Sequence, residues 1–253
     1  MPHPAPRALA ENAGLVFVGE RVALTAFIPP KLAEQMLGTR NPHGKSNADV
    51  LRRLATAADP RRPAIHWLID FPPEMGEREA SLYEHPFHYL YRTARPTRDR
   101  WGVNPHADAR LRAALAKRER YLATPIGAEL PAFLWFESDI IPDDTLVALA
   151  RDDDFTHGVV QSRGFVLWWR RFHSRSTPTL ALSSFPFPWP LATTLSALTA
   201  TQEEQRHAIA RAARGGDSDQ LNATVAAAYG WPVGLDDDEL LTHLQTLHRQ
   251  RAD

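Results

Sequence analysis

The sequence predicts an α+β fold in which a small mixed or antiparallel β-sheet with flanking helices precedes a C-terminal helical region. Short apolar runs at 121–126, 131–137 and 144–150 are separated by Pro, Gly and acidic residues, as is typical of strands joined by turns. The Pro- and aromatic-rich stretch SSFPFPWP cannot lie inside a helix. Helical segments follow it, so we expect two domains, 1–189 and 190–253.

The N-terminal elements are predicted from turn and capping residues. Residues 1–12 are rich in Pro and Ala and predict an extended lead-in. Two alternating runs surround Gly19-Glu20, which favours a two-residue hairpin turn. The segment KLAEQML predicts a short helix stopped by Gly38, and Asn47 is placed to cap a helix through about Leu54.

The next elements carry similarly local signals. AIHWLIDF predicts a buried strand between two prolines, and the segment 76–96 predicts a helix in two pieces that divide near Pro86. Beyond the stretch SSFPFPWP, which we call the Pro-rich strap, LATTLSALTATQEEQRHAIARAAR predicts a helix ending at Gly215-Gly216. DQLNATVAAAYG and DDDELLTHLQTLHRQR predict two more, the last with acids at its start and bases at its end, as the helix dipole favours.

Composition limits the class of protein. The 253 residues are 43% apolar with seven Trp, enough for a sizeable core, and the net charge is −1. There is no Cys, which excludes disulfides and thiolate sites and fits a reducing compartment. The N-terminus has no apolar signal region and no apolar run could cross a bilayer, so we expect a cytoplasmic protein without a membrane partner.

Catalytic signatures are missing from the sequence. There is no GxGxxG or GxxxxGK[ST] loop, no nucleophile elbow, and no Asn/Asp-Pro-Pro-aromatic motif such as an amino-methyltransferase uses to hold a flipped base. His85 and His88 have HxxH spacing without a recognisable third ligand, so structural roles are the better interpretation. Asp152–Asp154 favour a solvated turn or a helix cap. We therefore expect neither catalytic nor metal-binding residues in this chain.

Two basic stretches flank the predicted sheet and indicate a polyanionic partner. Arg163, Arg170, Arg171 and Arg175 lie among aromatic residues with no acid between the first and the last. Guanidinium groups bind phosphates and the O6/N7 edge of guanine in two-point geometry. Trp168 and Trp169 could stack on bases, although helix neighbours point in different directions and at least one should belong to the core.

The second stretch, from Arg92 to Arg120, is also rich in arginine. From the two stretches we predict two kinds of DNA contact. The residues expected to approach base edges are Arg163, Arg170, Arg171, Arg175, Ser162 and His173. The residues expected to contact phosphates are Arg95, Arg98, Arg100, Arg118 and Arg120.

The order of the longer motifs resembles one protein family over nearly the whole chain. The motifs are NAGLVFVG, NPHGKSNADVLRRL, HWLIDFPPEMGEREASLYEHPFHYL, TARPTRDR, RYLATP, PDDTLVALARDDDFTHGVVQSRGFVLWW, SSFPFPWP and YGWPVGLDDDELLTHLQTLHRQRA. Together they resemble the target recognition domain and C-terminal helical region of MmeI-like (type IIL/IIG) enzymes, which are single-chain restriction–modification proteins that methylate adenine at N6.

The resemblance implies a function for the chain and for what accompanies it. It implies a module that reads double-stranded DNA for a methyltransferase, with S-adenosylmethionine bound on a catalytic domain or partner subunit and no cofactor in this chain. The chain is then a fragment of a longer enzyme or a separate specificity subunit. It departs from the family where WGVNPHAD replaces a longer basic insertion and where GAELPAF replaces a Lys-His pair.

Two other hypotheses remain open from the sequence. In the first, the chain is an adaptor or inhibitor that docks a methyltransferase or defence complex without reading DNA. In the second, it is an enzyme whose site carries no familiar motif. Binding of a partner in the absence of DNA distinguishes the adaptor, and methyl transfer by the isolated chain distinguishes the enzyme.

Overall fold

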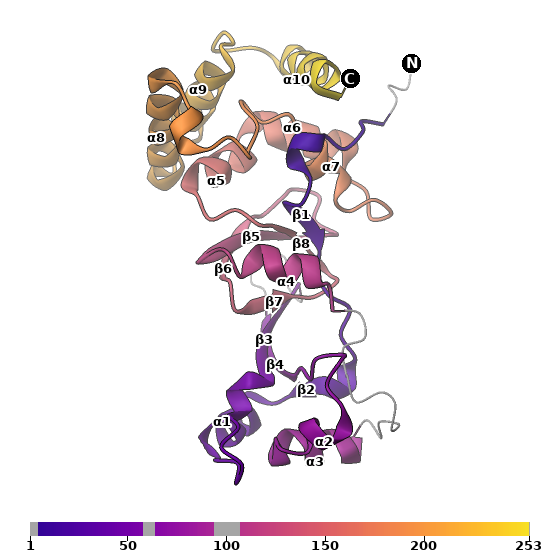
Figure 1. Cartoon of the computed structure of the whole chain (residues 1–253). Helices are drawn as coiled ribbons and strands as arrows, with labels where there is room; N and C mark the ends of the chain where they lie inside the picture. Colours follow the sequence, from indigo (N-terminus) through magenta and orange to yellow (C-terminus); the bar gives the residue numbers. More distant parts are fainter. Residues whose placement is uncertain (1–4, 58–63, 94–106, 253) are drawn as a thin grey trace.

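The computed structural model describes residues 5–57, 64–93 and 107–252. Figure 1 shows an elongated molecule in which two small sheets lie one after the other along the long axis. Helices α1, α2 and α3 cover one end, and the C-terminal helices cover the other. The predicted α+β class is therefore confirmed, although the strands form two sheets and not one.

The first sheet has the strand order β1-β8-β5-β6, and all its pairs are antiparallel. Its strands are β1 (Val16–Val18), β5 (Arg120–Pro125), β6 (Leu134–Glu137) and β8 (Leu146–Leu149). The three strands predicted around residues 121–150 are thus confirmed. Every residue of β8 is buried because the sheet is covered on both faces, which explains its continuous apolar run.

The second sheet has the order β2-β4-β3-β7 and is mixed, because β3 pairs with β7 in parallel. Its strands are β2 (Phe27–Ile28), β3 (Leu51–Thr56), β4 (Ala64–Ile69) and β7 (Ile140–Pro142). The strand predicted at 64–71 is confirmed, whereas β7 was not predicted. This short strand follows β6 in the chain but crosses to the other sheet, and so connects the two halves.

The helix predicted from Asn47 to about Leu54 is wrong. A 3-10 turn, Asn47–Asp49, is followed directly by β3. Asn47 is buried and its amide donates to the carbonyl of Met36 at 2.8 Å, while its oxygen accepts from Asn41 at 2.8 Å. Tertiary pairing on both edges of β3 therefore overrides the local capping signal.

The hairpin predicted at Gly19-Glu20 is also wrong. β1 pairs with β8, and β2 pairs with β4 in the other sheet, so the two alternating runs never meet. The physical role of Gly19 is close approach: a Cβ atom there would lie 2.1 Å from the carbonyl oxygen of Asp143. Glu20 continues this contact by donating its N–H to the carbonyl of Pro142 at 2.8 Å.

The helices follow their local signals more closely. They are α1 (Pro30–Gly38), α2 (Glu77–Ala80), α3 (Glu84–Thr93), α4 (Ala109–Leu115), α5 (Asp154–Gln161), α6 (Arg163–Phe172), α7 (Leu180–Ser183), α8 (Ala200–Gly215), α9 (Ser218–Tyr229) and α10 (Asp237–Ala252). The break between α2 and α3 precedes Pro86, which lies in the first turn of α3 where a missing N–H is tolerated. Asp153 caps α5, as predicted.

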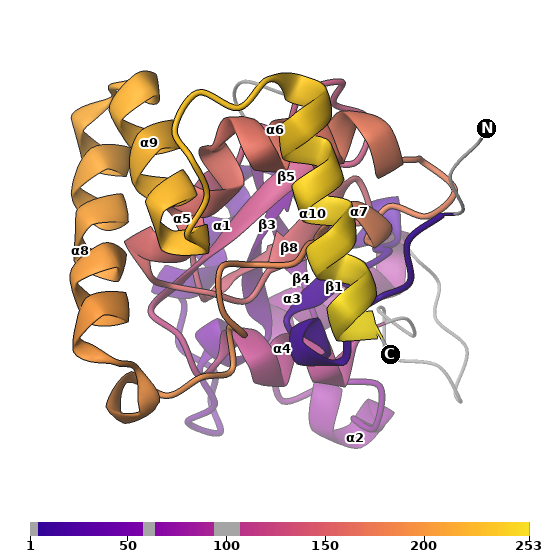
Figure 2. The same cartoon turned by 90° about the horizontal axis from the view of Figure 1, so that it is seen from above.

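The C-terminal helical region matches the prediction except at its start. The helix expected from residue 191 begins only at Ala200, because Thr199 and Gln202 form a capping box there. Gly216 and Gly230 end α8 and α9 with positive φ, the conformation that glycine adopts without strain. Figure 2 shows α8 beside α9, and α10 lying over α6.

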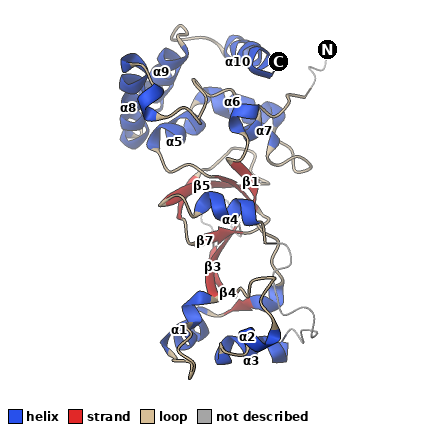
Figure 3. Cartoon of the chain, in the orientation of Figure 1, coloured by secondary structure: helices blue, strands red, loops and turns tan. Residues whose placement is uncertain are grey.

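One apolar core joins this helical end to the first sheet. It contains Trp168 and Trp169 of α6, Phe185 and Phe187 of the Pro-rich strap, and Ile209 of α8. Residues on both sides of position 189 thus share a core. Figure 3 shows the strands in the middle of the molecule with α4 beside them, and other helices at the two ends. No helix in the described ranges combines the length and apolar character needed to cross a lipid bilayer.

Candidate nucleic-acid interface

Helix α6 carries the basic segment that the sequence singled out. Ser162 is the N-cap of the helix. The face of α6 toward the core carries aromatic residues at helical spacing, namely Phe165, Trp168, Trp169 and Phe172. Both tryptophans are fully buried: the Trp168 indole donates to the Ser184 hydroxyl at 3.2 Å. The suggestion that they stack on bases is therefore wrong in this structure, since neither ring faces solvent.

Ser162 has a structural role. Its side chain is buried, donates to the carbonyl of Val159 at 2.7 Å and accepts from the N–H of Phe165 at 3.5 Å. It is the N-cap of α6. A hydroxyl engaged in this way is turned toward its own helix, so a direct contact with a base edge would require α6 to open at its start.

Arg163 is committed to the C-terminal helix. Its Nε donates to Asp237 at 2.7 Å, its Nη1 donates to the carbonyl of Leu235 at 2.8 Å, and its backbone N–H donates to Asn222 at 2.8 Å. These bonds fasten α9 and the start of α10 to the start of α6. The guanidinium of Arg163 thus lies at the opposite end of α6 from the other basic residues.

The predicted phosphate contacts Arg118 and Arg120 lie near the acidic start of α5. Arg120 donates to Asp154 at 2.8 Å and stacks over the Trp135 ring, with its guanidinium carbon 3.8 Å from the ring centre. Arg118 is a looser neighbour of Asp152, at 3.8 Å. Each is thus offset by a carboxylate. Arg95, Arg98 and Arg100 lie outside the described residues.

The remaining predicted residues gather where α6 ends. Arg170, Arg171 and Arg175 are exposed, and no carboxylate of the described residues lies within ion-pair distance of them. We call these three residues the α6 basic end. The position of Arg170 and Arg171 in the last turn of α6 is favourable because cations at a helix C-terminus interact well with the helix dipole. They also keep their charge available for a partner.

The connection between β5 and β6 is held against the α6 basic end. The Trp169 indole donates to the carbonyl of Ala128 at 3.2 Å, and the His173 ring nitrogen Nε2 lies 2.5 Å from the carbonyl oxygen of Ile126. The guanidinium of Arg175 lies against Gly127, where a Cβ atom would be 2.9 Å from Nη2. Two chain segments therefore meet at Arg175.

His173 is a structural residue of this surface. Its ring stacks on Trp169 at 4.0 Å between centres and 9° between planes. Burial lowers the pKa of His173, an effect that the hydrogen bond to Ile126 opposes and Arg175 reinforces. Burial likewise lowers the pKa of His157, which packs against Trp135. Both rings are thus held in the neutral form more strongly than in the unfolded chain.

The two histidines predict a stability that falls in acid. Because their folded pKa lies below the unfolded value, the unfolded state binds protons first as the pH drops. The free energy of unfolding should be fully retained above about pH 7 and should decrease as the pH falls through about 6.5. Urea unfolding at several pH values should show this decrease. In His173→Gln the free energy of unfolding should change less steeply with pH than in the wild type. His43→Gln, at an exposed position, is the control; equal slopes for all three proteins would contradict the prediction.

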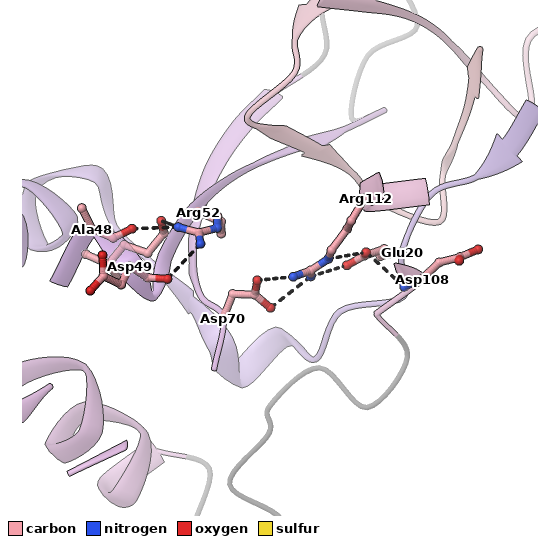
Figure 4. A network of polar contacts seen from close by, with 8 residues as sticks. Glu20, Ala48, Asp49, Arg52, Asp70, Asp108 and Arg112 are labelled. Atoms are coloured by element: carbon pink, nitrogen blue, oxygen red, sulfur yellow. Dashed lines mark hydrogen bonds and ion pairs between the residues drawn. The ribbon is translucent and has the colours of Figure 1, made fainter. Parts of the chain in front are cut away.

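Ion pairs between segments distant in the chain were not predicted from the sequence. In Figure 4, Arg112 of α4 lies between the carboxylates of Glu20 and Asp70, at 2.7 and 2.6 Å. Arg53 of β3 similarly contacts Glu137 and Asp139 beside β7. No local spacing signals such contacts, since the partners are brought together only by the two sheets.

Metal-ligand geometry is not found in the described ranges, where no group of three or more His, Asp or Glu side chains is arranged to hold an ion. His85 and His88 lie on α3 in a shallow hollow shared with Leu32 and Met36 of α1.

Comparison with known proteins gives one informative likeness. No family model matches this sequence, and no curated protein matches it. A solved structure of the type IIL restriction–modification enzyme MmeI in complex with DNA superposes with a TM-score of 0.63. The match covers 99% of this chain and 37% of that chain, at 12% sequence identity. It shows a shared fold, and this chain spans little more than a third of the length of that enzyme.

Proposed function

We propose that this chain is the DNA sequence-recognition module of an adenine-N6 DNA methyltransferase in a restriction–modification or phage-defence system. The α6 basic end carries this proposal, because exposed guanidinium groups without acidic partners among the described residues are suited to phosphates and base edges. The fold supports it, since nearly the whole chain superposes on part of an enzyme solved with DNA.

The proposed DNA contact is narrower than the set of residues expected from the sequence. Arg170, Arg171 and Arg175 approach the duplex, with His173 and the connection between β5 and β6 holding Arg175 in position. Arg163, Arg118 and Arg120 act through the ion pairs that shape the surrounding surface. S-adenosylmethionine and the reactive groups belong to a methyltransferase domain or subunit that binds this chain.

The test is DNA affinity as a function of salt. Replacing all three arginines of the α6 basic end with Gln should lower the slope of log K against log salt by about 1 for each phosphate that the protein no longer neutralises. The decrease in affinity should be similar for all sequences if the arginines bind phosphate. If one of them reads a base, its single variant should relax selectivity at one position, at a cost of about 1–3 kcal/mol.

A matched control removes the same charge elsewhere. Arg40, Arg78 and Arg211 are exposed, and no carboxylate of the described chain pairs with them, so their triple Gln variant has the same net charge. Fluorescence anisotropy with a labelled duplex, measured on the full chain over a range of salt, compares the two variants. Equal slopes for the two would remove the α6 basic end as the DNA contact.

A further inference from the structure

The helical end of the molecule contains an apolar groove of about 300 Å³. It lies between α6, α9, the start of α10 and the connection that leads from α9 to α10. Figure 2 shows this connection near α6. Its apolar lining includes Phe185, Tyr229, Trp231, Leu240 and Leu244. Val233 at its rim is 71% exposed. A large apolar residue exposed beside an apolar groove is typical of a surface that binds another protein.

The walls of the groove are held in place by specific contacts. Tyr229 and Trp231 stack at 4.1 Å and 8°, and the Tyr229 hydroxyl donates to the carbonyl of Pro186 at 2.8 Å. On the other side, Arg163 fastens Asn222 of α9 and Asp237 of α10 to α6. Because these bonds are already formed, the groove exists before any partner binds, which lowers the entropic cost of binding.

Acidic residues, which we call the acidic rim, line this groove or lie beside its lining residues in the sequence. Asp219 lines it, and Asp236, Asp237, Asp238 and Glu239 lie between its lining residues Leu235 and Leu240. Arg163 is the single cation among the described lining residues, and Asp237 already neutralises it. Acids at the start of α10 also stabilise that helix through its dipole. Their surplus beside an apolar groove would nevertheless repel DNA phosphates and attract cationic side chains.

We infer that this groove is a docking site for a basic amphipathic helix of a partner protein. The apolar stripe of such a helix would enter the groove, and its Lys or Arg residues would face the acidic rim, as in other helix-in-groove complexes. The inference goes beyond DNA recognition, because the groove lies at the N-terminus of α6 and the α6 basic end lies at its C-terminus. One helix therefore separates a protein-binding face from a DNA-binding face.

The experiment uses the full chain and labelled synthetic peptides. The probe is a helical peptide with Leu and Phe on one face and Lys on the other. The first comparison peptide carries Glu in place of Lys, and the second has the same composition with its apolar positions scrambled. Saturable binding of the basic amphipathic peptide, at least about tenfold tighter than either comparison, is expected in fluorescence anisotropy. Equal affinity for the basic and acidic peptides would overturn the inference.

Protein variants locate the bound peptide. Ala223 lines the groove, so Ala223→Phe should fill it and weaken binding at least about tenfold. Ala227→Phe adds the same bulk on an exposed position of α9 outside the groove and should bind as the wild type does. Unchanged affinity in a folded Ala223→Phe protein would overturn the inference.

A second pair of variants does not depend on packing. Asp219→Asn removes an acidic side chain that lines the groove and should weaken binding of the basic peptide, most strongly at low salt. Glu204→Gln, on the exposed surface of α8, is the control with an altered charge away from the groove. If both proteins bind the peptide equally at every salt concentration, the acidic rim does not select the partner.

Discussion

Replacing Arg112 with Leu is expected to lower the free energy of unfolding by about 3–5 kcal/mol, the usual cost of removing one partner of a buried ion pair. Arg112 donates from Nε and Nη2 to Glu20, both at 2.7 Å, and from Nη1 to Asp70 at 2.6 Å. The side chains of Glu20 and Asp70 are 0% and 3% exposed. The Leu variant would remove the guanidinium that bridges these two buried carboxylates.

The position of this cluster in the fold makes the effect large. Glu20 follows β1 of the first sheet, Asp70 follows β4 of the second, and Arg112 belongs to α4. The cluster thus connects the two halves of the molecule (Figure 4). Its loss should loosen their relative position as well as lower global stability, because the cluster acts together with β7, the Glu20 backbone and the Arg53 ion pairs in joining the two halves.

Urea unfolding monitored by circular dichroism measures this effect. Arg110→Leu is the control on the same helix, because the Arg110 side chain is 87% exposed and its ion pair with Asp108 is long, at 3.6 Å. It should change stability by no more than about 1 kcal/mol, as exposed ion pairs do. Adding Glu20→Gln and Asp70→Asn to Arg112→Leu should restore part of the loss. Similar unfolding midpoints for the two single variants would show that the cluster contributes little.

Trp169→Ala should be comparably destabilising, at about 3–5 kcal/mol, because it leaves a large cavity in the core shared by α6 and the first sheet. The ring is 0% exposed and packs edge-on against Phe133. Its loss also removes the hydrogen bond to Ala128 and the ring on which His173 stacks. We therefore expect the surface around Arg175 to lose its order in the same variant.

The two roles considered for Trp169 predict different results. If the ring is a core residue, stability and DNA affinity fall together, and Trp169→Phe, which keeps most of the apolar contact, retains much of both. If the ring stacked on bases, DNA affinity would fall while the unfolding midpoint stayed near that of the wild type. Parallel measurements of unfolding and of duplex binding on both variants distinguish these roles.

Much of the fold could be predicted because its signals are local. The strands β5, β6 and β8 appear as apolar runs between turn residues, and α8 and α9 end at glycines with positive φ. In contrast, Gly19 and Asn47 carry strong turn and cap signals that lead to the wrong elements. Both residues are used for contacts with distant backbone, and no local pattern reveals such contacts.

The candidate site could be predicted only in part. The sequence placed four arginines around α6 but could not show that Arg163 pairs with Asp237, or that Arg170, Arg171 and Arg175 have no described acidic partner. Arg163 and Asp237 are 74 residues apart. Composition counts the charges of a segment, whereas ion pairing depends on which segments the folded chain brings within a few ångströms.

By itself, the amino-acid sequence determined the α+β class, the glycines that end α8 and α9 and the basic, aromatic character of α6, because these depend on residues close together in the chain. Only the tertiary structure decided how the strands divide between two sheets, which tryptophans are buried and which of the described arginines form ion pairs. These features depend on contacts between residues far apart in sequence, and packing and electrostatics select such contacts only when the whole chain has folded.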